Sequence, residues 1–372
     1  MKIFYFSGAT LPSDSAQSVH VMKMCRAMAV DSKNNAVTLF AKGSMENDDE
    51  DIFRYYGTPS IFSLVISQNA KILFWTGILR LAGHSWALQE HGNPDLAYGR
   101  DAVELGYLIP QNVPVVFEAH EMPSSFFAVR AFKKLIQRRR ASFVVISESL
   151  RNDLLRKFPK LKKERVFVAP DGADISKSVA PREIPGRSDA LKVGYTGSLH
   201  EGKGMEIIAT LAKLSPDFDF HVVGGSKEQV AEWQGRNLPG NIFMHGHVPH
   251  VELASWLAAF DILIAPYRDK VKAKAGRDIS QWMSPLKIFE YMAARKPMLA
   301  SDLPVLREVL RHGENALLVS PSDPKVWAES LEKLKDAALR EQLAGTAYSD
   351  LEQRYSWEKR ARNILKFVEK RI

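Results

Sequence analysis

The segment from Ser284 to Pro297 (SPLKIFEYMAARKP) combines residue types that could bind a phosphorylated ligand. Ser284 is a favourable N-cap and Pro285 suits a first helical position, so we expect a helix to begin here. The free N–H groups at such an end attract phosphate, and Lys287 adds a full positive charge. Glu290 follows within one turn, where its carboxylate suits the hydroxyls of a ribose. An ordinary capped helix is the alternative interpretation of this segment taken alone.

A second candidate phosphate loop precedes this segment. Residues 191–196 predict a strand, the loop Gly197-Ser198-Leu199-His200-Glu201-Gly202-Lys203-Gly204 follows, and residues 205–214 predict a helix. The loop departs from the P-loop pattern, because its spacing differs and neither Ser nor Thr follows the lysine. Its glycines could still cradle phosphates while Lys203 supplies charge.

His120 follows the predicted strand 113–118 directly. In a parallel sheet, residues just past the carboxyl end of a strand line the ligand crevice, so a functional role is favoured over a structural one. The strand predicted at 3–7 leads into a loop of small residues that begins at Gly8, and a helix is expected over 18–29. His20 lies in the first turn of that helix, where a surface or packing role is commoner.

A metal site is not predicted. His245, His247 and His250 lie close together in the sequence, but no Cys or acidic ligand joins them. The single cysteine, Cys25, excludes an intramolecular disulfide and is expected to be a buried structural thiol. We therefore expect no cofactor and a reducing, cytoplasmic location.

The composition is that of a soluble globular protein with two domains. The chain has 372 residues, of which 45% are hydrophobic and 25% charged, and its formal net charge is +8. No apolar run is long enough to span a bilayer, and the first residues lack the layout of a secretory signal. The positive charge suits an anionic partner: nucleic acid, anionic lipid or a phosphorylated small substrate.

Two segments could contact a membrane. The range 61–81 is apolar with a few charges and is expected to form a core helix, with an interfacial helix as the alternative. The range Arg130–Arg140 (RAFKKLIQRRR) is expected to form a strongly basic helix, whose charges either form an ordinary solvated face or contact an anionic membrane surface. Because it lacks base-stacking aromatic residues and matches no nucleic-acid motif, nucleic acid is not expected as a partner. Peripheral association with the inner face of the membrane is thus a second expectation for location.

Predicted strands and helices alternate in two successive runs along the chain, and a linker at about 175–189 separates the two runs. We expect one Rossmann-like domain over residues 1–178 and another over 190–355. The last segment, 356–372, is expected to contain a basic amphipathic helix.

Taken in order, these motifs resemble the retaining nucleotide-sugar glycosyltransferases of family 4. The resemblance rests on Tyr195-Thr196-Gly197-Ser198-Leu199 with Lys203-Gly204 after three residues, on the His120 loop and on Ser284–Pro297. It implies an α/β fold of the GT-B type: two facing Rossmann-like domains, of which the first binds the acceptor and the second the donor. It also implies that the C-terminal helix crosses back to the N-terminal domain.

The resemblance also implies roles for residues. Lys203 and the helix N-terminus would bind the donor diphosphate, Glu290 the ribose, and the turn at 246–248 the base; His120 would lie beside the transferred sugar and the acceptor hydroxyl. The donor-binding residues implied are Gly197, Ser198, Lys203, Gly246, His247, Val248, Ser284, Pro285, Leu286, Lys287 and Glu290. Those with a catalytic role are His120, Lys203 and Glu290, and those on the acceptor side are Gly8, Ser18, His20 and Arg100. No metal is implied.

The sequence departs from the family pattern at two positions. Ser198 stands where the family often has a phosphate-binding arginine, and Trp282 stands where it has a first glutamate, eight residues before Glu290. The donor sugar is therefore not specified, and Arg277 or Lys287 is expected to replace the lost charge.

The predicted activity is transfer of a hexose from a UDP- or GDP-sugar to a hydroxyl of a glycan or lipid-linked acceptor, in cell-surface polysaccharide or glycolipid synthesis. A nucleotide-sugar epimerase or hydrolase with the GT-B fold is the alternative enzyme. A basic protein that binds polyanions without catalysis is the non-enzymatic alternative.

Overall fold

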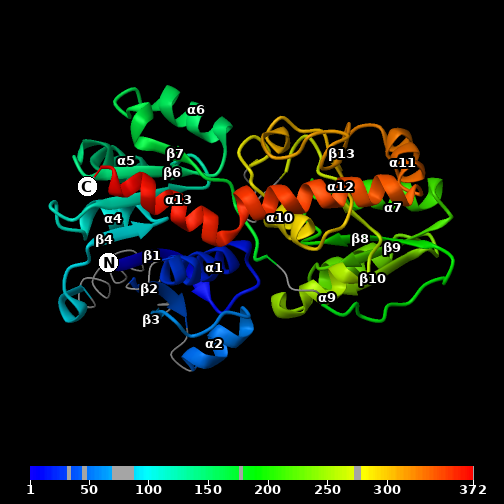
Figure 1. Ribbon diagram of the computed structural model, residues 1–372, viewed down its shortest axis with the longest axis horizontal. Helices are drawn as coiled ribbons and strands as arrows, with labels where there is room; N and C mark the ends of the chain where they lie inside the picture. Colours follow the sequence, from blue (N-terminus) through cyan, green and yellow to red (C-terminus); the bar gives the residue numbers. More distant parts are fainter. Residues whose placement is uncertain (32–34, 44–47, 69–87, 176–178, 272–277, 372) are drawn as a thin grey trace. The chain divides into compact units, whose positions relative to one another are not determined.

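The computed structural model describes residues 1–31, 35–43, 48–68, 88–175, 179–271 and 278–371 (Figure 1). The chain forms two compact units. One comprises Met1–Pro170 together with Trp357–Ile372, and the other comprises Asp171–Ser356. Each unit is built on one parallel sheet with helices, so the expected α/β class with two Rossmann-like domains is confirmed.

The sheet of the first unit has seven strands in the order β3-β2-β1-β4-β5-β6-β7. All its pairings are parallel, and the chain changes direction across the sheet between β1 and β4. Ligands of such sheets bind beyond the carboxyl ends of the strands at this switch point. The strands are β1 (Lys2–Leu11), β2 (Ala36–Gly43), β3 (Ser63–Gln68), β4 (Leu96–Gly99), β5 (Val115–Ala119), β6 (Ala141–Val145) and β7 (Val166–Val168).

Several helices of this unit begin at side-chain caps. Asp101, Ser125 and Ser147 each accept a hydrogen bond from the backbone of the first turn that follows, which satisfies N–H groups that the helix itself leaves free. The helices are α1 (Ala16–Asp31), α2 (Asp49–Tyr55), α4 (Ala102–Tyr107), α5 (Phe126–Gln137), α6 (Glu148–Lys157) and the C-terminal α13 (Trp357–Glu369).

Helix α13 returns to the first unit, as the resemblance implied (Figure 1). It packs along α1. Two ion pairs link these helices, Arg26 Nη2 to Glu358 Oε1 at 2.5 Å and Arg362 Nε to Asp31 Oδ1 at 2.7 Å. The apolar face of α13 is buried on this unit, in agreement with the amphipathic pattern of its sequence.

The sheet of the second unit has six parallel strands in the order β10-β9-β8-β11-β12-β13. Its switch point lies between β8 and β11, so the loops after these two strands share one edge. The strands are β8 (Leu191–Thr196), β9 (Phe218–Val223), β10 (Ile242–Gly246), β11 (Ile262–Ala265), β12 (Met298–Ser301) and β13 (Leu317–Val319).

The helices of the second unit cover a core that lies on both faces of the sheet. They are α7 (Met205–Leu214), α8 (Lys227–Gln234), α9 (Leu253–Ala258), α10 (Leu286–Ala293), α11 (Pro324–Lys333) and α12 (Ala337–Asp350). A short 3-10 turn, η2 (His250–Glu252), precedes α9, and a π-helical turn over Leu351–Tyr355 follows α12.

The helix expected over 61–81 is wrong where the structure describes it. Ser63–Gln68 is strand β3, the edge strand of the first sheet, because its residues extend the parallel ladder of β2. Residues 69–81 of this prediction lie outside the described residues. In the described part of the chain, no helix is both long enough and apolar enough to cross a bilayer.

Candidate functional site

Lys287 is a buried cation in the second unit. It lies in the first turn of α10, and its Nζ is 3.8 Å from the centre of the Tyr195 ring and 5.2 Å from that of Tyr267. Among the residues that the structure describes, Nζ has no hydrogen-bond partner. Burial, and then repulsion from Lys203, hold the pKa of Lys287 well below its usual value. A bound anion would offset the cost of burying this charge.

Lys203 shares one of these rings. Its Nζ lies 5.3 Å from the centre of the Tyr267 ring. Burial lowers the pKa of Lys203 to about 8. Two amino groups with depressed pKa values on one aromatic ring form a site that favours a multiply charged anion over a single carboxylate.

Gly197 brings the loop after β8 against Lys287. Its φ is +134°, and a Cβ at this position would lie 2.9 Å from Lys287 Nζ. The loop that contains Lys203 and the start of α10 are therefore neighbours, as the family resemblance implied. Ser198 contributes its carbonyl oxygen, which accepts a hydrogen bond from the Tyr195 hydroxyl at 2.7 Å.

The predicted N-cap at Ser284 is wrong. The N-cap is Pro285, which offers no side-chain acceptor, and α10 begins at Leu286. Pro285 is itself extended, with ψ at 124°, so the helix begins one residue later than expected and Ser284 lies too early to cap it. Its hydroxyl instead accepts the backbone N–H of Asp171 at 2.8 Å. No side chain therefore caps the first N–H groups of α10, so these groups are available to donate hydrogen bonds to an anion.

Glu290 has a partner that the sequence did not indicate. Its Oε1 lies 2.9 Å from His250 Nε2, and both side chains remain partly exposed. His250 opens the turn η2 shortly after β10, so the pair connects that loop with α10. The carboxylate keeps its second oxygen for a further hydrogen bond.

The turn at 246–248 lies beside the phosphate loop. The Gly246 carbonyl accepts the Gly224 N–H at 2.6 Å, and a Cβ at Gly224 would lie 2.1 Å from the Gly197 carbonyl oxygen. His247 is exposed, and Val248 packs against the core. The loops after β8, β9 and β10 are thus consecutive neighbours along one edge of the sheet.

Two histidines of this region contact each other, and a third contacts a carboxylate. His245 Nε2 lies 3.0 Å from His221 Nδ1, and the two rings stack. Burial, and then repulsion from His245, lowers the pKa of His221 to about 4. His250 pairs with Glu290 instead, so His245 and His250 have different partners.

Of the two departures from the family pattern, Ser198 is described above and Trp282 lies in the turn before α10. The backbone N–H of Trp282 donates to the Ile279 carbonyl in the turn before α10, and its side chain is partly exposed. Arg277 lies outside the described residues. Lys287, the other candidate to replace the lost charge, is the buried lysine beside Tyr195 and Tyr267 described above.

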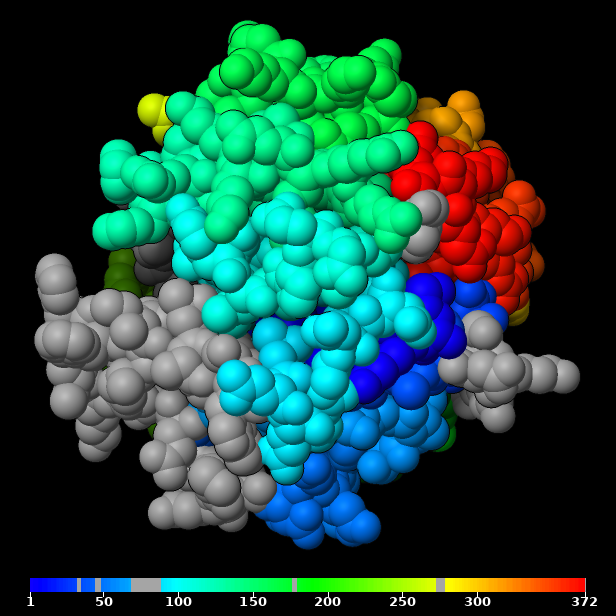
Figure 2. Space-filling model, turned by 90° about the vertical axis from the view of Figure 1, so that its left-hand side faces the viewer, coloured from blue at the N-terminus to red at the C-terminus, as the bar shows by residue number. Residues whose placement is uncertain are grey.

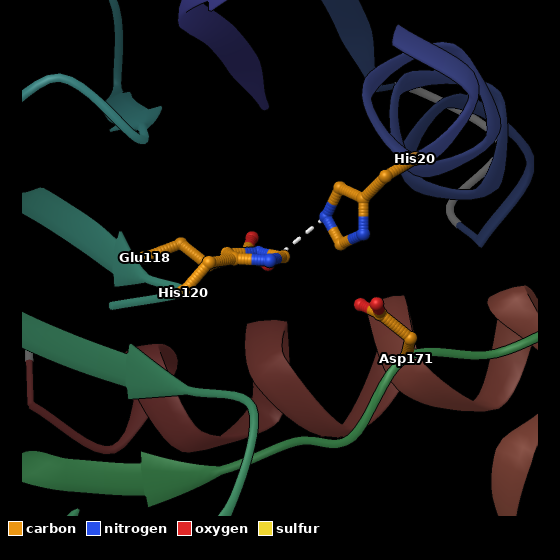
Figure 3. Close-up of side chains that lie close together, drawn as sticks. All are labelled: His20, Glu118, His120 and Asp171. Atoms are coloured by element: carbon orange, nitrogen blue, oxygen red, sulfur yellow. Dashed lines mark hydrogen bonds and ion pairs between the residues drawn. The ribbon is translucent and has the colours of Figure 1, made fainter. Parts of the chain in front are cut away.

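In the first unit, the buried carboxylate of Glu118 lies close to side chains from α1, β4, α13 and the loop after β5; Figure 3 shows two of them, His20 and His120. Arg360 Nη2, His20 Nε2 and His120 Nε2 lie 2.8, 2.9 and 2.7 Å from Oε1, and the Tyr98 hydroxyl donates to Oε2. Burial by itself would raise the pKa of Glu118, but Arg360, then His20, holds this pKa well below its usual value. The guanidinium group on the carboxylate makes this cluster a poor cation site.

His120 is the most open member of this cluster. It follows the carboxyl end of β5, as predicted, and its side chain is 16% exposed. Burial and the charge of Arg100 lower the pKa of His120 to about 4, although the hydrogen bond to Glu118 acts in the opposite direction. The ring is therefore neutral at physiological pH, and because Nε2 donates to Glu118, Nδ1 can accept one further hydrogen bond.

The residues expected on the acceptor side differ in their burial and in their hydrogen-bond partners. His20 is 1% exposed and faces Glu118, so it supports the cluster and is closed to solvent. The hydroxyl of Ser18 is buried against Ser13, Ser15 and the Thr10 carbonyl.

Gly8 belongs to β1, because that strand continues to Leu11 and the loop expected from Gly8 starts later. Arg100 follows β4, and its Nη1 is buried without a hydrogen-bond partner among the described residues.

Several site residues escaped the sequence analysis. Tyr195 and Tyr267 enclose Lys287, and Glu118 joins Arg360 to His120. One signal was present: a lone glutamate in the apolar strand VVFEA is costly to bury without a partner. The identity of the partner depends on the fold, because Arg360 is more than 200 residues away in the chain.

Comparison with known families matches the second unit. Residues 190–336 match the family model described as "Glycosyl transferases group 1". The chain is 30% identical over 168 residues to the D-inositol 3-phosphate glycosyltransferase of a Nocardioides species, covering 44% of this chain and 31% of that protein. It is 27% identical over 207 residues to the phosphatidyl-myo-inositol mannosyltransferase of Mycobacterium leprae, covering 54% and 52%. The chain thus spans about half or less of the length of these curated relatives.

Solved structures share the fold of the entire chain. The structure of Anabaena Alr3699/HepE in complex with UDP has a TM-score of 0.70 at 18% identity, with all of both chains covered. TarM, another solved structure, has a TM-score of 0.72 at 12% identity, with 99% of this chain and 98% of that chain covered. These similarities show that the chain has the GT-B fold.

Proposed function

We propose that this chain, whose residues 190–336 match the group 1 glycosyl transferase model, moves a sugar from a nucleoside diphosphate to a hydroxyl group of an acceptor. The donor is a UDP- or GDP-sugar that binds to the second unit. The acceptor is a glycan or lipid-linked sugar that binds to the first unit. Anabaena HepE, which shares the fold, was crystallised with UDP-glucose, and this supports a nucleotide-sugar donor.

One observation carries the proposal: the pair of amino groups on Tyr267. Lys203 and Lys287 both lie about 5 Å from this ring, beside the uncapped start of α10. Burying two cations together is unfavourable unless an anion joins them. A diphosphate has the charge and length to accept N–H groups from the helix and both lysines at once.

The proposed reaction breaks the bond between the anomeric carbon and the diphosphate oxygen, and the electron pair leaves with the diphosphate. A bond forms between the acceptor oxygen and the anomeric carbon, and the acceptor proton passes to the leaving phosphate. Negative charge develops on the leaving group, where Lys203 and Lys287 stabilise it. Removal of one such interaction typically costs about 3 kcal/mol of transition-state stabilisation.

We propose retention of the anomeric configuration, on the strength of the family resemblance alone. His120 then binds and orients, and the leaving phosphate acts as the base. The low pKa of His120, about 4, supports this role, because a ring that is neutral at pH 7 can hold a hydroxyl without adding a charge. No metal takes part in the proposed mechanism.

The acceptor belongs, in this proposal, to cell-surface polysaccharide or glycolipid synthesis at the inner face of the membrane. The relative from M. leprae is named for a phosphatidyl-inositol substrate, which supports a lipid-linked acceptor. The basic residues of α5 support the location, because anionic lipids attract them.

A thermal-shift series tests the donor site. Pyrophosphate, UDP, GDP and their sugars are added to the wild type and to Lys203→Met, Lys287→Met and Lys213→Met. We expect pyrophosphate and one nucleotide to raise the melting temperature of the wild type and of the control at exposed Lys213. Stabilisation by nucleotide that persists unchanged in both site variants would contradict this assignment.

Incubation with the stabilising sugar nucleotide, without acceptor, tests the enzyme class. A transferase is expected to hydrolyse the donor slowly and to leave the remaining sugar unchanged. An epimerised sugar would favour the alternative enzyme. Steep salt-dependent binding to nucleic acid with no response to nucleotides would favour the non-enzymatic alternative.

A further inference from the structure

Two adjacent phenylalanines project from the start of α5. Phe126 and Phe127 are each 72% exposed, and their ring centres are 5.6 Å apart. Ser125 caps the helix through the Ala128 N–H, so the pair lies on an ordered first turn. Exposed rings of this size are unfavourable in water, and neighbouring apolar residues on a surface commonly mark a contact site.

The same helix presents basic residues on the phenylalanine side. Arg130 and Lys133 are exposed, and they follow Phe126 by four and seven residues, which places all three on one face of the helix. Lys134 lies over the ring of Tyr107, with Nζ 4.1 Å from the ring centre, and Tyr107 is itself 45% exposed. No Asp or Glu occurs between residues 122 and 147. Along this stretch of the chain, exposed aromatic rings therefore accompany basic residues and no acidic ones.

The basic segment is shorter than the sequence suggested. Helix α5 ends at Gln137 and not at Arg140. Arg138 is buried, and its guanidinium group donates to the carbonyls of Ile109, Pro110 and Val113. This arginine stabilises the fold, so it cannot contribute to a surface contact. Arg139 and Arg140 are exposed beyond the end of the helix, and the exposed charges on the helix itself lie nearer the phenylalanines.

We propose that Phe126 and Phe127 insert into the headgroup region of an anionic lipid bilayer, while Arg130, Lys133 and Lys134 contact the lipid phosphates. Amphipathic helices that lie in a membrane interface combine buried rings with flanking cations in this way. The positive charge favours an anionic partner, and the two exposed rings beside it favour one that also offers an apolar region, as a lipid bilayer does. Figure 2 shows the face that contains this part of the chain, in blue-green. The inference does not depend on the donor site.

Vesicle sedimentation tests the inference. The full chain is mixed with vesicles of phosphatidylcholine alone or with added phosphatidylglycerol. We expect binding to the anionic vesicles only. Phe126→Ser/Phe127→Ser should weaken binding at least about tenfold, because the apolar contribution is lost. Phe126→Leu/Phe127→Leu should retain most of it. Serine variants that bind as tightly as the wild type would overturn the proposal.

A matched pair of variants tests the charges. Arg130→Glu/Lys133→Glu and Lys213→Glu/Lys227→Glu change the net charge equally, but the second pair lies in the other unit, on exposed residues. We expect only the first pair to abolish binding, with about a fivefold loss for each charge removed. Equal losses in both pairs would overturn the proposal, because attraction would then depend on net charge alone.

Fluorescence reports insertion directly. Cys25 is buried, so a cysteine introduced at position 127 can be labelled selectively with an environment-sensitive dye. A blue shift on anionic vesicles is expected for Phe127→Cys and not for Val30→Cys, since Val30 is 55% exposed on another helix. An unshifted spectrum at position 127 in vesicle-bound protein would overturn insertion and indicate a contact of another kind, such as a protein partner.

Discussion

His250 Nε2 and Glu290 Oε1 lie 2.9 Å apart and connect the loop after β10 with helix α10. The pair leaves the other carboxylate oxygen of Glu290 available. Lys287, one turn earlier on α10, lies at the diphosphate site proposed above. An imidazole that holds one oxygen restricts the rotation of the carboxylate, and a restricted acceptor binds a vicinal diol at a lower entropic cost.

Replacement of His250 should therefore weaken ribose recognition specifically. For His250→Ala, we expect the advantage of UDP over 2′,3′-dideoxy-UDP to fall by about 1 kcal/mol, the usual net value of one hydrogen bond. Affinity for pyrophosphate should not change. Isothermal titration of the three ligands measures these differences.

His250→Gln serves as the matched control, because its amide can still donate to Glu290. It should recover most of the discrimination, whereas a purely structural defect would lower the affinity for all three ligands together. Full discrimination in His250→Ala would show that Glu290 needs no support. Equal affinity of the wild type for UDP and its dideoxy analogue would instead contradict ribose binding by Glu290.

Nucleotide binding should be coupled to proton uptake. Burial lowers the pKa of Lys203 to about 8 and also depresses that of Lys287, and a bound diphosphate would raise both. The affinity for UDP should therefore decline as the pH rises above about 8. At about pH 8.5, part of the free protein has lost the Lys203 proton. Calorimetry at this pH in two buffers of different ionisation enthalpy should therefore detect protons taken up on binding.

The free protein should show the opposite trend in stability. A lysine whose pKa is lowered on folding destabilises the folded state below its folded pKa, and this cost is relieved as the pH rises from about 8 towards the unfolded value near 10.5. In Lys203→Arg, the group stays charged, so both pH dependences should be weaker in this range. An unchanged pH profile in this variant would assign the effect to another group.

Gly197→Ala should impair the donor site without a large change elsewhere. The new Cβ would lie 2.9 Å from Lys287 Nζ. The backbone φ of +134° at this position is also one that residues with a side chain rarely adopt. We expect the affinity for UDP to fall about tenfold and the free energy of unfolding by about 1 to 2 kcal/mol. Gly345→Ala is a suitable control, because a Cβ at Gly345 meets no atom within 4 Å. Equal effects in both variants would contradict the proposed role of Gly197.

Arg360→Met should destabilise the first unit. Arg360 is 3% exposed and bonds Glu118 and the carbonyls of Ala169 and Pro170, so its loss leaves a buried carboxylate without its main counter-charge. We expect a loss of about 3 to 5 kcal/mol in urea unfolding at pH 7. Arg362→Met, which removes a more exposed ion pair, should cost less than about 1 kcal/mol.

The same pair predicts a pH dependence. Because the pKa of Glu118 is depressed in the folded state, its contribution to stability is present above its unfolded pKa and is lost as the pH falls through the folded one. The difference between wild type and Arg360→Met should thus shrink below about pH 4. A constant difference across the acid range would show that packing of the arginine stem, and not its charge, accounts for the loss.

The sequence by itself determined the fold class and the place of the donor loops. Alternation of apolar strands with helices predicts parallel sheets, and loops at the carboxyl ends of such strands must share an edge. The family resemblance added that Lys203 and Lys287 are neighbours, although 84 positions separate them in the sequence. The helix 205–214 was also correct at both ends, because Gly204 and the apolar spacing define it locally.

Only the tertiary structure decided which side chains complete each cluster. Tyr267, His250 and Arg360 reach Lys287, Glu290 and Glu118 from distant parts of the chain, and no local pattern encodes such pairs. The same reason explains the errors: proline displaced Ser284 from its cap, and an edge pairing made residues 63–68 a strand. Spacing determines the face of an element on which a residue lies. The packing of elements determines what that residue contacts, and here it decides which charges are paired.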